Sequence, residues 1–232
     1  MSNKIKHLLW VENFKILSEV SLTKKVDYET TNTYSTLNTL TTDTKNIWIA
    51  CHGIGFLSKF FIGYFENLDP ELNYVIAPQA PSKYYQTKAY KYVGASWLTK
   101  ENREQEIENV LNYLDAILQT EKLPKDKKII LFGFSQGVSV VTRWLAKRKV
   151  NCDHLVIHSG SIPTEFDATS FAYLPDLKTS IIFGNEDEYL SEERIRAQLQ
   201  LALSIFPNAP EIIKFDGKHV MHPESIKKIS EM

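Results

Sequence analysis

Short, continuous runs of apolar residues alternate with longer amphipathic segments from residue 46 onward. Continuous apolarity is typical of strands that are covered on both faces, which is the condition of a parallel sheet. The expected strands are NIWIACHG (46–53), NYVIAP (73–78), KKIILFGF (127–134), DHLVIHSG (153–160), SIIFGN (180–185) and PEIIKFD (210–216). The pattern therefore predicts a mostly parallel central sheet that needs helices on both faces.

Segments with helical period lie between these strands. One begins at Asn102, where Gln105 three residues later completes the pattern of a capping box, and it ends before Pro124. A second runs from Gln136 to about residue 149. A third is capped by Ser191, and His222 with Pro223 opens a short fourth helix. Strands that alternate with helices predict an α/β fold with right-handed crossovers.

The first 45 residues have a different pattern, rich in Thr, Asn and Lys. The segment KKVDYETTNTYSTLN (24–38) has the β-branched and aromatic content of exposed strands, so it predicts one hairpin or edge strand. With neither an internal repeat nor a linker in view, residues 1–232 are interpreted as one domain. Residues 1–22 form an extension whose role the pattern leaves open.

Composition and charge narrow the classes of function. With 27 basic and 28 acidic residues, the chain has no electrostatic footprint for nucleic acid or an anionic membrane surface. Cys51 and Cys152 lie in apolar runs without a disulfide framework or metal-ligand spacing, which suits a reducing cytoplasm. The amino terminus lacks a signal-peptide pattern, and no apolar run approaches the ~20 residues of a membrane span.

The segment GFSQG carries the strongest chemical motif, because it stands between an expected strand and an expected helix. That context favours a nucleophile elbow, G-x-S-x-G, in which Ser135 is presented at the start of a helix. Gly133 and Gly137 then avoid collisions with the neighbouring strand and helix, and the backbone N–H of Gln136 faces a developing oxyanion. A serine that merely caps a helix is the alternative.

A serine nucleophile needs a base and a group that orients the base. Asp187 follows the strand SIIFGN, and His219 follows the strand PEIIKFD, in the order Ser, acid, His that this fold uses. All three would meet at the carboxyl edge of the sheet. Taken singly, Asp187 fits a solvated acidic loop and His219 fits a surface loop, but their joint order favours a triad.

The segment CHGIGF supplies a second oxyanion donor, which we assign to the backbone N–H of Ile54. The glycines of this segment allow its backbone to approach the serine closely. The segment lacks the further glycine of a dinucleotide fingerprint. His52 precedes the serine and is interpreted as a packing or hydrogen-bonding residue. His158 is interpreted as part of the wall near the site.

The segments CHGIGF, APQAP, GASW, GFSQG, HSGSIP, GNEDEYLS and DGKH occur in an order that resembles the phospholipase/carboxylesterase family. These serine esterases are similar to the acyl-protein thioesterases and belong to the α/β-hydrolase superfamily. The resemblance implies cofactor-free hydrolysis of esters or thioesters by Ser135, Asp187 and His219. It places Ile54 and Gln136 at the oxyanion positions, and it implies that Trp97 helps to form the acyl pocket.

Departures from the family pattern concern the substrate rather than the reaction. Phe56 stands where the family commonly has a small acidic residue, and Lys218 stands where glycine is usual. The segment 82–96 carries four tyrosines, of which Tyr85 and Tyr92 are candidates for the pocket mouth together with Phe56. Packing of the tyrosines against one another at the surface is an equal alternative.

These observations predict a serine hydrolase with an α/β-hydrolase fold that needs no metal and no cofactor. The expected partner is a small-molecule ester or thioester, with an acylated protein as a further substrate class, and neither nucleic-acid binding nor membrane insertion is expected. Acyl length and oligomeric state stay open. A non-catalytic binding module on the same scaffold is the rival hypothesis, and amide hydrolysis is a weaker alternative.

Overall fold

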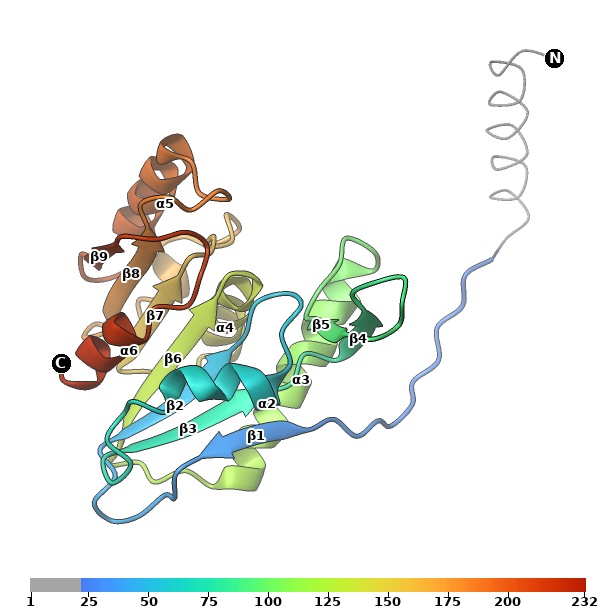
Figure 1. Ribbon diagram of the computed structural model, residues 1–232, viewed down its shortest axis with the longest axis horizontal. Helices are drawn as coiled ribbons and strands as arrows, with labels where there is room; N and C mark the ends of the chain where they lie inside the picture. The colour runs from blue at the N-terminus through green and yellow to red at the C-terminus, as the bar shows by residue number, and fades with distance from the viewer. Residues whose placement is uncertain (1–21) are drawn as a thin grey trace. The chain divides into compact units, whose positions relative to one another are not determined.

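The computed structural model describes residues 22–232, and a seven-stranded sheet forms its centre (Figure 1). The strand order is β1-β3-β2-β6-β7-β8-β9, and β1 alone runs antiparallel to its neighbour. The strands are β1 Tyr34–Leu37, β2 Asn46–Cys51, β3 Asn73–Pro78, β6 Lys128–Phe134, β7 His154–His158, β8 Lys178–Gly184 and β9 Glu211–Phe215. The predicted parallel sheet and its six strands are confirmed.

The amino-terminal prediction is confirmed as an edge strand rather than a hairpin. Strand β1 pairs with β3 from Tyr34 opposite Pro78 to Leu37 opposite Val75. Residues 22–33 contain neither helix nor strand, and 32–232 form one compact unit. The extension assigned to residues 1–22 lies, except for Leu22, outside the described residues.

Helices cover both faces of the sheet, because alternate residues of each buried strand point to opposite sides. Ile47 and Ile49 of β2 pack in one core, whereas Trp48 and Ala50 pack in the other. The first core is closed by α3 Arg103–Glu121, α4 Gln136–Arg148 and α5 Glu192–Ile205. The second is closed by α2 Ser58–Phe61, the 3₁₀ helix η1 Ile62–Phe65 and α6 Pro223–Ser230.

The capping box predicted at the start of α3 is wrong. Asn102 has φ 47° and ψ 35°, and its side chain makes no capping bond. An N-cap residue normally has extended backbone, from which its side chain reaches the N–H groups of the first turn. Gln105 bonds Asn109 instead, and Glu106 accepts hydrogen bonds from the backbone and hydroxyl of Thr99. The apolar stripe of α3 is nevertheless buried as expected.

Two other predicted helix starts are confirmed. The Ser191 hydroxyl accepts a hydrogen bond from the Arg194 backbone N–H and caps α5. Pro223 is the first residue of α6, where a missing N–H costs no helical hydrogen bond.

A small antiparallel hairpin, β4 Ser82–Tyr85 with β5 Val93–Ser96, lies apart from the central sheet (Figure 1). The sequence pattern did not predict it, because its strands are short. All four residues of β4 are exposed, whereas Gly94, Ala95 and Ser96 of β5 are buried. The hairpin therefore has an inner side that can support the loops at the carboxyl edge of the sheet.

No disulfide occurs among residues 22–232. Cys51 and Cys152 are both buried and free, and burial raises the pKa of the Cys152 thiol to about 12. In the described part of the chain, no helix combines the length and the apolar character needed to cross a bilayer.

Candidate active site

Ser135 lies at a sharp turn between β6 and α4. Its φ of 51° and ψ of −115° are strained for a residue with a side chain, and its N–H is held by the His158 carbonyl at 2.9 Å. A Cβ at Gly133 would lie 2.5 Å from the Val138 Cα, and a Cβ at Gly137 would overlap the Cys51 carbonyl oxygen. Strand, turn and helix therefore approach too closely for any residue but glycine on either side of the serine.

Asp187 lies in the turn after β8, and its carboxylate is fully buried. One carboxylate oxygen accepts the Tyr189 backbone N–H at 2.9 Å, which leaves the other free for His219. The neighbours Glu186 and Glu188 are exposed, so this acidic cluster combines one buried carboxylate with two solvated ones.

His219 joins the serine and the carboxylate. Its Nδ1 lies 2.8 Å from Oδ2 of Asp187, and its Nε2 lies 3.0 Å from Oγ of Ser135. An ionised carboxylate only accepts hydrogen bonds, so Nδ1 carries the proton and Nε2 presents its lone pair to the serine hydroxyl. The imidazole ring is flanked by Phe134 at 5.2 Å and Tyr189 at 4.8 Å between ring centroids, which limits its rotation.

The other histidines near the site have structural partners. His222 stacks on Phe215 with ring centroids 4.3 Å apart, and its Nδ1 lies 2.8 Å from Oγ of Ser225. His158 lies beneath the site, and its Nε2 accepts the His222 backbone N–H at 3.2 Å. Burial lowers the pKa of His158 to about 3, so its imidazole is neutral near pH 7.

His52 supports the loop that follows β2. Its Nε2 accepts the Ala80 backbone N–H at 3.1 Å, so Nδ1 carries the proton and donates to the Gly53 carbonyl at 2.7 Å. Burial lowers the pKa of this imidazole to about 4. His52 therefore has the hydrogen-bonding role expected of it and does not line the cavity described below.

The backbone N–H groups of Ile54 and Gln136 have no hydrogen-bond partner among residues 22–232. Gln136 is the first residue of α4, where N–H groups have no partner within the helix. The Ile54 loop is held by Gly55, which has φ 88°, donates to the Ala95 carbonyl at 2.8 Å and accepts from the Gln86 side chain at 2.5 Å. The β4–β5 hairpin thus fixes this loop.

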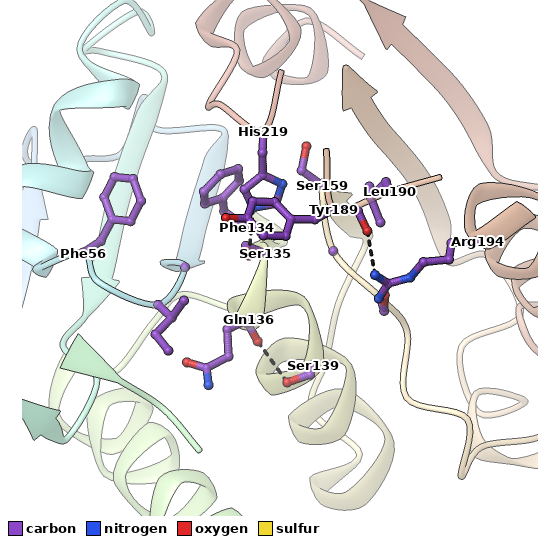
Figure 2. Close-up of a pocket in the computed structure, with 14 residues that line it drawn as sticks. Phe56, Phe134, Ser135, Gln136, Ser139, Ser159, Tyr189, Leu190, Arg194 and His219 are labelled. Atoms are coloured by element: carbon purple, nitrogen blue, oxygen red, sulfur yellow. Dashed lines mark hydrogen bonds between the residues drawn. The ribbon is translucent and has the colours of Figure 1, made fainter. Parts of the chain in front are cut away.

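A cavity of about 550 Å³ opens beside Ser135 and His219 (Figure 2). Of the residues predicted from the sequence, Ile54, Gln136 and Phe56 line it together with Ser135 and His219. The remaining lining residues are Gly53, Phe134, Ser139, Ser159, Gly160, Ser161, Tyr189, Leu190 and Arg194. Gly53, Phe134, Ser159 and Gly160 lie at the carboxyl ends of predicted strands, so the edge of the sheet was the available clue to them.

The other three predicted pocket residues do not line this cavity. Trp97 is completely buried, and its indole N–H donates to the His52 carbonyl at 2.8 Å. It therefore lies behind the Ile54 loop and supports it. Tyr85 and Tyr92 are exposed on the β4–β5 hairpin, and Tyr85 packs against Tyr90 with ring centroids 5.2 Å apart. This contact fits the alternative that the tyrosines pack against one another.

Comparison with protein families gives a match to the phospholipase/carboxylesterase model over residues 33–232. The chain belongs to this family. The fold and the resemblance drawn from the sequence motifs are confirmed, and the protein is an enzyme of the hydrolase class. None of the curated proteins compared with the chain matches it significantly.

Solved structures of low sequence identity share the fold of this hydrolase. It is similar to an acyl-protein thioesterase 2 from Zea mays, with 16% identity, a TM-score of 0.66 and coverage of 87% of this chain and 97% of the other. A Bacillus cereus carboxylesterase has 14% identity and a TM-score of 0.63, and the match covers 95% of this chain and 97% of the carboxylesterase. A phospholipase/carboxylesterase from Dyadobacter fermentans has 15% identity and a TM-score of 0.59, and the match covers 90% of this chain and 99% of the other.

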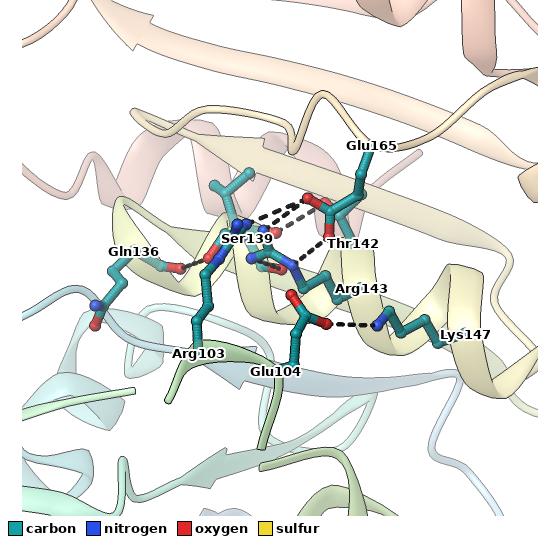
Figure 3. Close-up of polar contacts among 9 residues, drawn as sticks. Arg103, Glu104, Gln136, Ser139, Thr142, Arg143, Lys147 and Glu165 are labelled. Carbon is teal, nitrogen blue, oxygen red and sulfur yellow. Dashed lines mark hydrogen bonds and ion pairs between the residues drawn. The ribbon is translucent and has the colours of Figure 1, made fainter. Parts of the chain in front are cut away.

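One side of the hydrolase's cavity is held by an ion pair between a buried arginine and an exposed glutamate (Figure 3). Ser159, Gly160 and Ser161 begin the loop after β7, and Glu165 lies further along this loop. Both carboxylate oxygens of Glu165 accept hydrogen bonds from the buried Arg143 of α4, at 2.7 and 3.0 Å. Hydrogen bonding from Arg143 lowers the pKa of the Glu165 carboxyl. The pair therefore fastens the loop to α4.

We expect Glu165→Ala to lower the free energy of unfolding of the hydrolase by about 2 kcal/mol near neutral pH, because Arg143 would be left as a buried cation without its partner. Arg103→Ala is the matched control. Arg103 also contacts Glu165, at 3.3 Å, but its side chain is 48% exposed, so a loss below about 0.5 kcal/mol is expected. Urea unfolding of both variants measures the difference.

The pH dependence of this contribution has a definite sign. Since the folded state lowers the pKa of Glu165, the stabilisation is complete above the ordinary glutamate value of about 4.3 and is lost as the pH falls through the lower, folded-state value. The difference between wild type and Glu165→Ala should therefore shrink in acid. An equal loss from Arg103→Ala and Glu165→Ala at neutral pH would contradict the role of Arg143 burial.

Proposed function

We propose that this protein is a serine hydrolase that cleaves carboxylic esters or thioesters through an acyl-enzyme on Ser135. The observation that carries the proposal is the chain of contacts from Ser135 Oγ to His219 Nε2 at 3.0 Å and from His219 Nδ1 to the buried Asp187 carboxylate at 2.8 Å. Each member arises from a different loop at one edge of the sheet. A serine that only capped a helix would not need this base.

In the first half of the proposed cycle, the Ser135 oxygen attacks the carbonyl carbon while His219 Nε2 removes the hydroxyl proton. Asp187 orients the imidazole and stabilises its protonated form. The negative charge on the former carbonyl oxygen is stabilised by the free N–H groups of Ile54 and Gln136, at on the order of 3 kcal/mol for each donor. The imidazolium then protonates the alcohol or thiol as its bond to the acyl carbon breaks.

In the second half, water replaces the departed group. His219 takes a proton from this water, the resulting oxygen attacks the acyl-enzyme, and the proton returns to Ser135 Oγ as the carboxylic acid leaves. The cycle uses only side chains, backbone N–H groups and water, in keeping with the expectation of no metal or cofactor. Small-molecule esters and thioesters fit it, and so do acylated proteins.

Covalent labelling tests the proposal directly. A fluorophosphonate should add once per chain, and peptide mapping should find it on Ser135 rather than on Ser139, Ser159 or Ser161, which also line the cavity. Of these four hydroxyls, Ser135 is the one within hydrogen-bonding distance of His219. Absence of labelling on folded protein would favour the binding module and contradict the proposal.

Substrate screening then separates the two leaving-group classes. Nitrophenyl esters of graded acyl length, compared with thioesters of the same acyl groups, report acyl preference and leaving-group preference independently. If the folded protein hydrolysed neither the esters nor the thioesters, this result would contradict the proposed reaction.

A further inference from the structure

The cavity has two chemically different sides. Ile54 and Phe56 form an apolar side on the loop after β2. In the view of Figure 2, Phe56 and Arg194 lie on opposite sides of Ser135 and His219. An ester has two limbs that leave its carbonyl carbon in different directions, so one limb can face the apolar side while the other approaches Arg194.

The charge of Arg194 is not neutralised within the cavity. Among the described residues that line it, there is neither an aspartate nor a glutamate. One guanidinium nitrogen donates to the Tyr189 carbonyl at 2.6 Å, which fixes the direction of the side chain. A guanidinium has five N–H donors in a planar fork, so several stay available to a ligand.

Helix stability does not account for this arginine. Arg194 is in the first turn of α5, where the helix dipole disfavours a cation and favours the neighbouring Glu192 and Glu193. The capping bond from this position uses its backbone N–H, which any residue except proline could supply. Arg143, by contrast, has both a buried position and a carboxylate partner. Arg194 is therefore a cation whose side chain is fixed by the Tyr189 carbonyl and which has no acidic partner among the residues that line the cavity.

We propose that Arg194 binds an anionic oxygen group, a carboxylate or a phosphate, on one limb of the substrate. This inference rests on the proposed function and names the substrate class: esters or thioesters with a negative charge on one limb and an apolar group on the other. The guanidinium fork matches the paired oxygens of such a group, and charge-assisted hydrogen bonds are about twice as strong as neutral ones. Arg194 is thus a specificity-determining residue.

Matched substrate pairs test this assignment, with the charge placed on either limb. For the acyl limb, 4-nitrophenyl hydrogen adipate is compared with its neutral methyl ester. For the leaving limb, 4-acetoxybenzoate is compared with methyl 4-acetoxybenzoate, and 4-acetoxyphenyl phosphate tests a phosphate in place of the carboxylate. The measured quantity is the ratio of kcat/KM for the anionic substrate to kcat/KM for its neutral partner.

For at least one limb, we expect Arg194→Gln to lower this ratio about tenfold, since a hydrogen bond to a charged group is lost at an exposed residue. Arg194→Lys should retain part of the ratio, because it keeps the charge without the fork. Arg196→Gln is the matched control: it removes the same charge from the same helix, but Arg196 does not line the cavity. The ratio of this control should equal that of wild type.

The outcomes separate the two proposals. Hydrolysis of the neutral substrates with no anionic preference on either limb, or an unchanged ratio in Arg194→Gln, would overturn the role of Arg194 and leave the proposed function intact. Failure of folded wild type to hydrolyse any substrate would instead oppose the proposed function. An equal fall in Arg196→Gln would attribute the preference to the general field of the protein and would also overturn the assignment.

Discussion

Ser135→Ala should lower kcat/KM for ester hydrolysis by about four orders of magnitude or more, because it removes the nucleophile of the proposed cycle. The folded state should survive, since the Ser135 hydroxyl has His219 as its partner and alanine occupies the same strained turn at little additional cost. Purified variants assayed with a nitrophenyl ester measure the rate, and thermal unfolding measures the fold.

Ser58→Ala is a suitable control for this change. Ser58 is a buried serine on α2 that does not line the cavity, and its hydroxyl lies 3.0 Å from that of Ser35 on β1. We expect this variant to keep nearly all activity. Substantial activity in folded Ser135→Ala would mean that another group forms the acyl-enzyme or that hydrolysis is not covalent.

The second large effect concerns two histidines that lie three residues apart. His219→Ala should lower kcat by about three or more orders of magnitude, because Ser135 would lose the group that accepts its proton. His222→Ala should keep most activity, because the His222 imidazole bonds Ser225 and stacks on Phe215. The loss of these contacts should lower the free energy of unfolding by about 1–2 kcal/mol.

Steady-state kinetics and unfolding curves for the same two variants give the comparison. A large loss of rate in folded His222→Ala together with a small loss in folded His219→Ala would move the catalytic base by three residues. Such a result would also contradict the triad, since Asp187 is bonded to His219 and not to His222.

The sequence predicted best those contacts of the candidate site that form at the ends of strands. Ser135, Asp187 and His219 each follow a recognisable apolar strand within a few residues, and parallel strands bring their carboxyl ends to one edge. Their meeting therefore required no knowledge of side-chain packing. The same reasoning found the strands themselves, because residues buried on both faces must be apolar almost continuously.

Features that depend on the direction of a helix or loop were not predictable in this way. Arg194 lines the cavity because of the orientation of α5 over the sheet, which its local sequence does not specify. Trp97 follows a short hairpin strand. The position of this strand relative to the Ile54 loop decides whether Trp97 lines the pocket or supports the loop from behind. At Asn102, the residue types fit a capping box, but the backbone of Asn102 is left-handed and its side chain makes no capping hydrogen bond.

The antiparallel strand β1 has a consequence for which backbone groups stand unpaired at the edge of the sheet. It covers the outer side of β3, a strand whose six residues are all buried. If β1 were missing, β3 would be an edge strand, and its unpaired amide and carbonyl groups could pair with a strand of a second molecule. Residues 32–37 thus keep these groups paired, and any shortened form of the chain should retain them.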